Sequence, residues 1–226
     1  DIQEYINNMK DICNSLLEFV DGDDKEEDEL FNSLIYQINE HHILESSDDL
    51  HELLLLINSI SNNHFRGPRF IPKIERIIIF LSPSIKQTFT NMQIFNFFKF
   101  NKRILLTLIQ NKIIIVDEFI VNFLLDQRDE NRQNYRYYFF NEIKELIPNS
   151  DKKSIEIYLI QKDPHIFENF DKKCQIGEND SYICELIRND SVEEFISFVN
   201  RLNYPLNSIV ERSIFAICFC NKNNRI

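Results

Sequence analysis

The best pattern for a metal site in this sequence is the group His41, His42, Glu45 and His51. On a helix, residues four apart share a face, so His41 and Glu45 would point the same way while His42 points elsewhere. A zinc site on a single helix needs a His-Glu-x-x-His motif or a second pair of ligands, and the sequence has neither. We interpret the group as a solvated helix end and predict no metal or other cofactor.

The five cysteines form no metal motif either. Cys218 and Cys220 are separated by one residue, and Cys174 and Cys184 are separated by nine residues, so no zinc-ribbon spacing results. An odd number of irregularly spaced cysteines is typical of reduced thiols, which favours a cytoplasmic protein.

The acidic run from Asp21 to Glu29 resembles a calcium-binding loop in composition only. Its glycine, Gly22, stands at the second place, and Lys25 occupies a position where the loop needs a ligand. Negative charge does suit the N-terminus of a helix, where the helix dipole is positive. The run therefore predicts a solvated entrance to the following helix.

Catalytic motifs are missing from the sequence. Serine is common, but there is no Gly-x-Ser-x-Gly elbow and no glycine-rich turn of a nucleotide-binding fold, and the chain has only 3 glycines. No cysteine or histidine lies in the local setting of an activated nucleophile. We predict that the chain is not an enzyme. The alternative is an enzyme or regulatory subunit whose active part lies in missing residues.

Two basic clusters offer surfaces for a charged partner. The first consists of Arg66, Arg69, Lys73 and Arg76, and we predict that it contacts an acidic protein. The second interleaves arginine with tyrosine over residues 128–138, as some RNA-binding surfaces do. Adjacent acidic residues and the net charge of −11 oppose nucleic acid as a partner, and we interpret this second cluster as part of a buried helix face.

No apolar run reaches the roughly 20 residues that are needed to span a bilayer. The richest stretch, Ile113 to Leu125, is interrupted by Asp117 and Glu118. The net charge of −11 also disfavours an anionic membrane surface, so the sequence predicts no membrane insertion.

Helices joined by polar corners are the elements that must position these residues. A chain of 226 residues buries enough surface to fold without a disulfide or a metal. Its 3 glycines are too few for the turns of a β-sandwich or barrel, and its apolar residues recur at three-and-four spacing. The expected helices are 2–17, 30–38, 50–60, 73–81, 85–90, 92–100, 103–110, 116–125, 135–147, 153–161, 166–171, 181–188 and 192–201.

A weak internal repeat runs through the second half of the chain. Leu-Ile followed by a polar corner occurs at 108–112, 159–163 and 186–190, with a related copy at 146–150. Two corners lead into nearly identical helix starts, Val116-Asp117-Glu118-Phe119-Ile120 and Val192-Glu193-Glu194-Phe195-Ile196. Each helix pair would have a face that it cannot bury alone, so the pairs should stack.

These patterns predict an all-α fold of irregular stacked helix pairs, similar to an α-solenoid and ending in an ankyrin-like helix pair. Asn62 to Pro72 is the clearest break, and Pro72 suits the first turn of the next helix. We expect three segments: an N-terminal helical segment (1–66), an irregular helical array (67–178) and a truncated ankyrin-like region (179–226). The Val116–Leu125 helix is apolar nearly all round and should be enclosed on both sides.

One stretch resembles a known family. Residues 179–196, Asn-Asp-Ser-Tyr-Ile-Cys-Glu-Leu-Ile-Arg-Asn-Asp-Ser-Val-Glu-Glu-Phe-Ile, are similar to a motif of protist ankyrin-repeat proteins that carry a helical region ahead of their repeats. The similarity extends over about Ile155 to Phe215. It implies a protein–protein interaction scaffold in which ankyrin repeats follow and bind an unknown protein partner.

The sequence departs from this family after Phe215. An extended segment and further repeats are expected there, whereas the chain has Ala-Ile-Cys-Phe-Cys and a polar tail. A truncated product without independent function is therefore a further alternative. Within the ankyrin-like pair, Val192, Phe195, Ile196 and Val199 should form an inner stripe. Phe198 and Phe215 would stay exposed for a partner.

Overall fold

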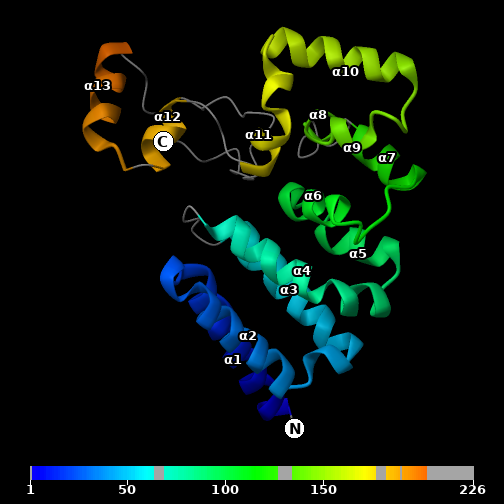
Figure 1. The fold of residues 1–226 in the computed structure, drawn as a ribbon, viewed down its shortest axis with the longest axis vertical. Coiled ribbons are helices and arrows are strands. Elements are labelled where there is room, and N and C mark those ends of the chain that lie inside the picture. The colour runs from blue at the N-terminus through cyan, green and yellow to red at the C-terminus, as the bar shows by residue number, and fades with distance from the viewer. Residues whose placement is uncertain (1, 64–68, 127–133, 177–181, 189, 203–226) are drawn as a thin grey trace. The chain divides into compact units, whose positions relative to one another are not determined.

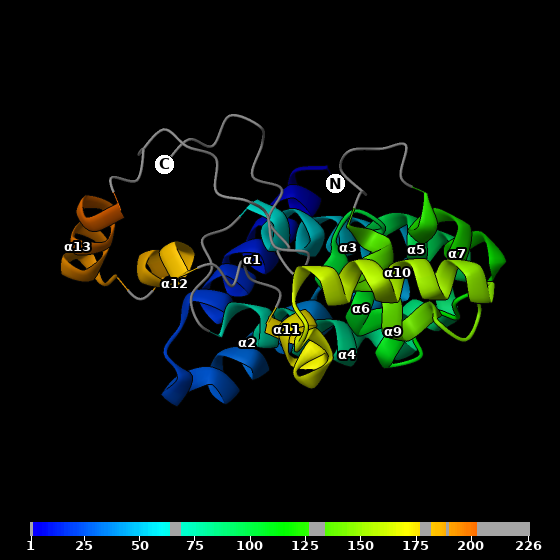
Figure 2. The ribbon, with the colours of Figure 1, turned by 90° about the horizontal axis from the view of Figure 1, so that it is seen from above.

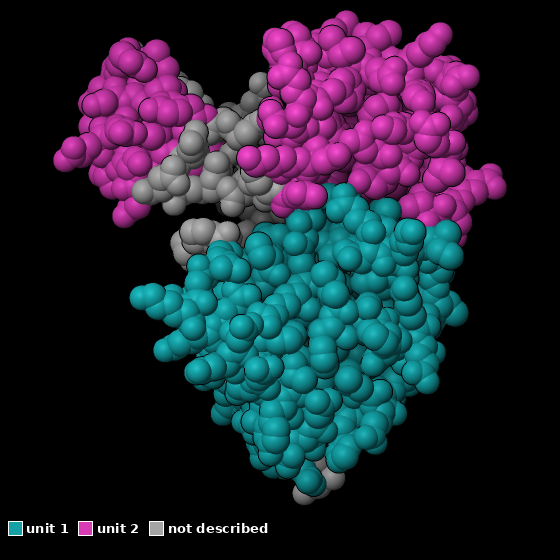
Figure 3. All heavy atoms as spheres, in the orientation of Figure 1, with its two compact units in different colours: residues 1–115 teal, residues 116–226 magenta. Residues whose placement is uncertain are grey.

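The structure is a computed structural model that describes residues 2–63, 69–126, 134–176, 182–188 and 190–202 (Figure 1). All regular elements in these ranges are helices, and none of the described residues forms a strand. The predicted all-α class is confirmed. The chain forms two compact units, residues 1–115 and 116–226, which are coloured separately in Figure 3.

Within its described residues, the first unit has six α-helices and two short 3₁₀ helices. Its elements are α1 (Ile2–Asp21), η1 (Asp24–Glu26), α2 (Glu27–Glu40), η2 (Ile43–Glu45), α3 (Ser47–Asn63), α4 (Phe70–Thr88), α5 (Asn91–Phe98) and α6 (Lys102–Gln110). Helices α1 and α2 lie side by side, and α3 packs on α4 and α5 on α6 (Figure 1). Consecutive helices thus pack as pairs, as the periodicity predicts.

The second unit has shorter helices. Its described elements are α7 (Glu118–Leu125), α8 (Tyr135–Tyr138), α9 (Phe140–Ile143), α10 (Asn149–Lys162), η4 (Ile166–Glu168), α11 (Phe170–Ile176), α12 (Tyr182–Arg188) and α13 (Val192–Leu202). Helix α10 lies across the α8–α9 segment, as Figures 1 and 2 both show. The three segments expected from the sequence do not coincide with the two units, because the break after Asn62 lies inside the first unit.

Close packing at Gly22 joins α1 to α2. The backbone amide of Gly22 donates to the carbonyl of Glu18 at 2.9 Å and extends the end of α1. A Cβ atom on Gly22 would lie 2.1 Å from the Leu30 side chain and 2.8 Å from the Glu18 carbonyl. A larger residue at position 22 would therefore require both the Leu30 side chain and the backbone at the end of α1 to shift.

Helix α4 is longer than the sequence indicates. Separate helices were predicted over 73–81 and 85–90, but one helix runs from Phe70 to Thr88 with Pro83 inside it. Proline has no amide hydrogen and usually ends or kinks a helix. Burial of Ile78, Leu81 and Ile85 on one face stabilises the helix on both sides of the proline. The prediction that Pro72 lies in the first turn is confirmed.

The segment 135–147, for which one helix was predicted, is divided in the structure. The structure has two single turns instead, α8 and α9, which meet at Phe139. The aromatic residues of this segment are buried and pack ring on ring, with Tyr138 and Phe139 centroids 4.9 Å apart. Tyr138 is also tied to α11, because its hydroxyl donates to the carbonyl of Cys174 at 2.8 Å and the Cys174 thiol donates to the carbonyl of Tyr138. Bulky rings thus set the path of the backbone here.

Two of the four Leu-Ile corners share one backbone geometry. In the first, the amide of Ile113 donates to the carbonyl of Leu108 at 2.8 Å, and Lys112 has a left-handed φ of 53°. In the second, the amide after Asp190 donates to the carbonyl of Leu186 at 2.9 Å, and Asp190 has a φ of 50°. Both are helix ends of Schellman type, in which a left-handed residue lets a late amide reach back into the last turn.

The other two corners differ from this geometry. At 159–163, Asp163 has an extended φ of −151° and follows the end of α10 directly. At 146–150, the chain turns into α10, whose first residue is Asn149. The repeat therefore predicts chain reversal at these corners, but a common structure at only two of them.

The last two helices form the predicted pair, but not the predicted inner stripe. Helices α12 and α13 pack against each other, and the rings of Tyr182 and Phe198 lie 5.2 Å apart. No described side chain of α13 is buried, and Val192 and Ile196 are more than half exposed. Phe195 and Val199 of the stripe are half-buried, so packing on the seven-residue helix α12 covers the stripe only in part, and the burial prediction was wrong.

The Val116–Leu125 prediction also needs correction. The helix begins at Glu118, after Asp117 accepts a hydrogen bond from the amide of Ile120 at 2.9 Å as its N-cap. Ile120, Val121 and Leu124 are buried, but Phe119 is 51% exposed. The helix is therefore enclosed on one side and open on the other.

Candidate functional site

The basic cluster predicted to bind an acidic partner is occupied by the chain itself. Arg69 forms ion pairs with Asp24 and Glu27, the latter at 2.9 Å. Arg76 donates to Glu27 at 3.0 Å and to Asp28 at 2.7 Å, and its guanidinium lies over the ring of Phe31. Arg66 lies outside the described residues.

Burial alone would lower the pKa of Arg76. The hydrogen bonds to Asp28 and Glu27, together with their charges, outweigh this effect and raise the pKa above its ordinary value. Arg76 therefore remains charged and paired.

Lys73 is the most deeply buried member of this cluster, with an exposed fraction of 2%. Its Nζ donates to the carbonyl of Gly22 at 2.6 Å and lies 5.8 Å from the centre of the Phe19 ring. The acidic segment 21–29 and the basic face of α4 are thus the two halves of one internal contact. In the described residues, Arg69, Lys73 and Arg76 all make contacts within the chain, while the Arg69 side chain is still half exposed. Binding of an external acidic protein at this cluster stays a prediction.

The histidine group gathers no ligand set. His42 Nδ1 lies 2.8 Å from a Glu45 oxygen, which raises the pKa of the imidazole through a hydrogen bond and an attractive charge. His51 packs against Phe97, with ring centroids 4.9 Å apart. Among the described residues, no group of three or more His, Cys, Asp or Glu side chains could hold a metal ion.

The arginine–tyrosine cluster is largely internal. Arg136 donates to the Tyr137 hydroxyl and lies over its ring, and Tyr137 stacks on Tyr158 of α10 with centroids 4.1 Å apart. Tyr135, Tyr137 and Tyr138 are buried. The rings that might have stacked on bases are therefore core residues, as interpreted from the sequence. The residues at 127–133 lie outside the described ranges.

Exposed apolar side chains gather on the α12–α13 pair. The large apolar residues of these two helices that are at least half exposed are Tyr182, Ile187, Val192, Ile196 and Leu202. Val192 and Ile196 are four residues apart, so they lie on one helical face. Phe198 is half-buried against Tyr182, and Phe215 lies outside the described residues. We call Val192 and Ile196 the α13 face.

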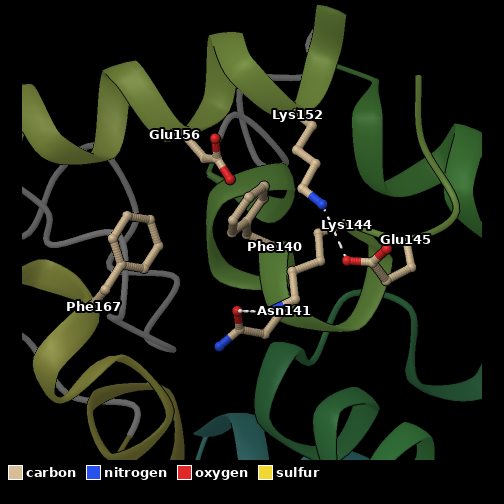
Figure 4. Close-up of a pocket in the computed structure, with 7 residues that line it drawn as sticks. All are labelled: Phe140, Asn141, Lys144, Glu145, Lys152, Glu156 and Phe167. Carbon is tan, nitrogen blue, oxygen red and sulfur yellow. Dashed lines mark hydrogen bonds and ion pairs between the residues drawn. The ribbon is translucent and has the colours of Figure 1, made fainter. Parts of the chain in front are cut away.

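A hollow of about 260 Å³ is the second candidate site, and the sequence reasoning did not find it. Its walls come from α9 and the turn after it, from α10, and from η4 (Figure 4). The lining residues are Phe140, Asn141, Lys144, Glu145, Lys152, Glu156 and Phe167. Only packing of three short elements brings these residues together, and no motif in the sequence indicates it.

Comparisons with known proteins identified no relative of this chain. No model of a known protein family, no curated protein and no solved structure matches the chain. Within the described residues, no helix has the length and apolar character to cross a membrane.

Proposed function

We propose that this chain is a protein–protein interaction scaffold and the helical leader of an ankyrin-repeat protein. The observation that carries the proposal is the α13 face. Val192 is 55% exposed and Ile196 is 52% exposed, although both lie on the apolar side of a strongly amphipathic helix. In stacked helical repeats, a pair buries one side by itself and the other side only against a neighbour.

The concentration of these side chains favours a binding surface over ordinary exposure. Single exposed apolar residues are normal on any protein. On the α12–α13 pair, however, five large apolar side chains are exposed within two short helices, and only Ile183 and Leu186 are buried among the described ones. Exposed apolar side chains gathered in this way are typical of interaction sites.

Charge on α13 indicates the chemistry of the partner. Glu193 and Glu194 stand in the first turn, and Arg201 stands in the last. A helix that brings its own apolar stripe, with basic residues opposite the two glutamates, would complement this surface. In this proposal the chain performs no catalysis and acts in the cytoplasm with its thiols reduced.

Affinity capture with matched variants tests the proposal. The wild-type chain, the double variant V192D/I196D and the control S197D are used to capture proteins from extracts of the source organism. Ser197 is an exposed polar residue of the same helix. The captured protein is then produced separately, and complex formation is measured by size-exclusion chromatography.

We expect a discrete complex with the wild type and with S197D, and none with V192D/I196D. Far-UV circular dichroism checks that all three chains remain equally helical. A complex that survives V192D/I196D, or one that S197D abolishes equally, would contradict binding through the α13 face.

A further inference from the structure

The hollow beside α10 has one aromatic wall in the core and one at the surface. Phe140 is 2% exposed, whereas Phe167 is 42% exposed, and their ring centroids lie 6.1 Å apart. At this distance the two rings contact each other, and both line the hollow (Figure 4). An apolar side chain placed there would cover the Phe167 ring and remove it from water.

Two charged side chains that line the hollow, Lys144 and Glu156, form no ion pair with another described residue. The Lys144 Nζ donates to Asn141 Oδ1 at 3.2 Å, and Asn141 in turn donates to Asp171, so the ammonium group is positioned by a neutral amide. Glu156 projects from α10 toward Phe140 (Figure 4). Within the described part of the chain, neither Lys144 nor Glu156 forms an ion pair.

The other two charged residues of the hollow behave differently. Lys152 Nζ lies 3.1 Å from Glu145 Oε1, so these two neutralise each other at the rim. The hollow therefore offers an aromatic surface between one unpaired cation and one unpaired anion.

We propose that this hollow binds a short peptide segment through one apolar side chain, with an acidic residue beside Lys144 and a basic residue beside Glu156. A space of about 260 Å³ accepts a single leucine- or phenylalanine-sized group and is below the usual size of sites for whole small ligands. Phosphate-rich ligands are disfavoured by Glu145 and Glu156 on the lining. The site is separate from the α13 face and does not depend on it.

Selection from a displayed library of random seven-residue peptides, with the purified full chain as bait, tests the proposal. Selected peptides are synthesised with a fluorophore and titrated by fluorescence anisotropy. We expect enrichment of an apolar residue that has an acidic neighbour on one side and a basic neighbour on the other. F167A should weaken binding about tenfold, because the exposed ring is the main apolar contact.

Charge reversal gives the sharper test. K144E should weaken binding at least about tenfold, and a peptide whose acidic residue is replaced by lysine should bind K144E better than it binds the wild type. K172E makes the same charge change on an exposed residue of α11 outside the hollow, and it should bind like the wild type.

Recovery by the lysine-substituted peptide separates recognition from misfolding, since a misfolded K144E would bind neither peptide. The proposal is overturned if no peptide is enriched over bait-free controls. It is also overturned if the selected peptides bind K144E and F167A as tightly as K172E. Neither result bears on the α13 face, which is tested with a different partner and different variants.

Discussion

The helix starts at 116–120 and 192–196 have nearly the same sequence and opposite environments. Ile120 of α7 is completely buried, whereas Ile196 of α13 is 52% exposed. Both follow a Leu-Ile corner with a left-handed residue, Lys112 in one case and Asp190 in the other. The local pattern therefore specifies a corner and a helix in both places, while the neighbouring elements decide whether its apolar face becomes core or surface.

A similar contrast separates the charged contacts of the first unit from the hollow of the second. Arg69 and Arg76 have carboxylate partners, and Lys73 has the backbone carbonyl of Gly22 as its partner. Lys144 has only a neutral amide partner, and no described cation pairs with Glu156. Charges already satisfied within the chain stabilise the fold, whereas unsatisfied charges beside an exposed ring are available to a ligand.

Truncation of the isoleucine at each helix start should give the largest difference in the free energy of unfolding. Ile120→Ala should lower the free energy of unfolding by about 2–5 kcal/mol, because it leaves a cavity in packed surroundings. Ile196→Ala should change it by less than about 0.5 kcal/mol, because the residue is already solvated. Urea denaturation followed by circular dichroism measures both. Equal losses would show that Ile196 is core, contrary to the α13 face.

The N-cap of α7 should give the next largest effect. Asp117→Ala removes the acceptor for the Ile120 amide and should cost about 1 kcal/mol of unfolding free energy. Asp117→Asn keeps a capping acceptor and should cost much less. The aligned residue Glu193 lies within the first turn of α13, so Glu193→Ala should cost no more than about 0.5 kcal/mol. Equal losses in Asp117→Ala and Asp117→Asn would mean that capping is not the cause.

Glycine at the left-handed residue should stabilise the protein at both Schellman-type corners, and by a similar amount. Lys112 and Asp190 have φ values of 53° and 50°, which L-residues adopt at a cost. Lys112→Gly and Asp190→Gly should each raise the free energy of unfolding by up to about 1 kcal/mol. Lys112→Ala should not, since alanine keeps the steric cost. A higher free energy of unfolding for Lys112→Gly but not for Asp190→Gly would show that the two corners are not equivalent.

The smallest effect is expected at the corner with a different geometry. Asp163 accepts a hydrogen bond from the amide of His165 at 2.9 Å and one from Lys173 at 3.3 Å. The hydrogen bond from the His165 amide is the larger of the two causes that lower the pKa of Asp163. Because the folded pKa is depressed, the stabilisation is present above the unfolded pKa and is lost as the pH falls through the folded pKa.

The melting temperature of Asp163→Asn should therefore lie slightly below that of the wild type at neutral pH. The two should converge as the pH falls below the ordinary aspartate range. A difference that persists unchanged in acid would exclude ionisation of Asp163 as its source.

Much of the fold follows from the sequence because helices are specified locally. Three-and-four spacing of apolar residues predicts where helices lie, because residues at this spacing share one helical face within one or two turns. Helix continuity was less predictable. Separate helices were expected over 73–81 and 85–90, yet packing of the flanking turns carries α4 through Pro83. Buried rings divide the segment at Phe139.

The sites depended on contacts between distant residues, which spacing along the chain does not reveal. Sequence reasoning identified both the acidic segment and the basic cluster, but only the tertiary structure pairs Arg76 with Asp28, 48 positions away. It likewise brings Phe167 to Phe140 around a hollow that no motif indicates. Helical periodicity fixes which residues share a face, and the free energy of burial decides which faces meet. The sequence by itself thus determined the helical class, the position of most helices and two corners. The tertiary structure decided where helices continue or break, and which charges and apolar faces remain for a partner.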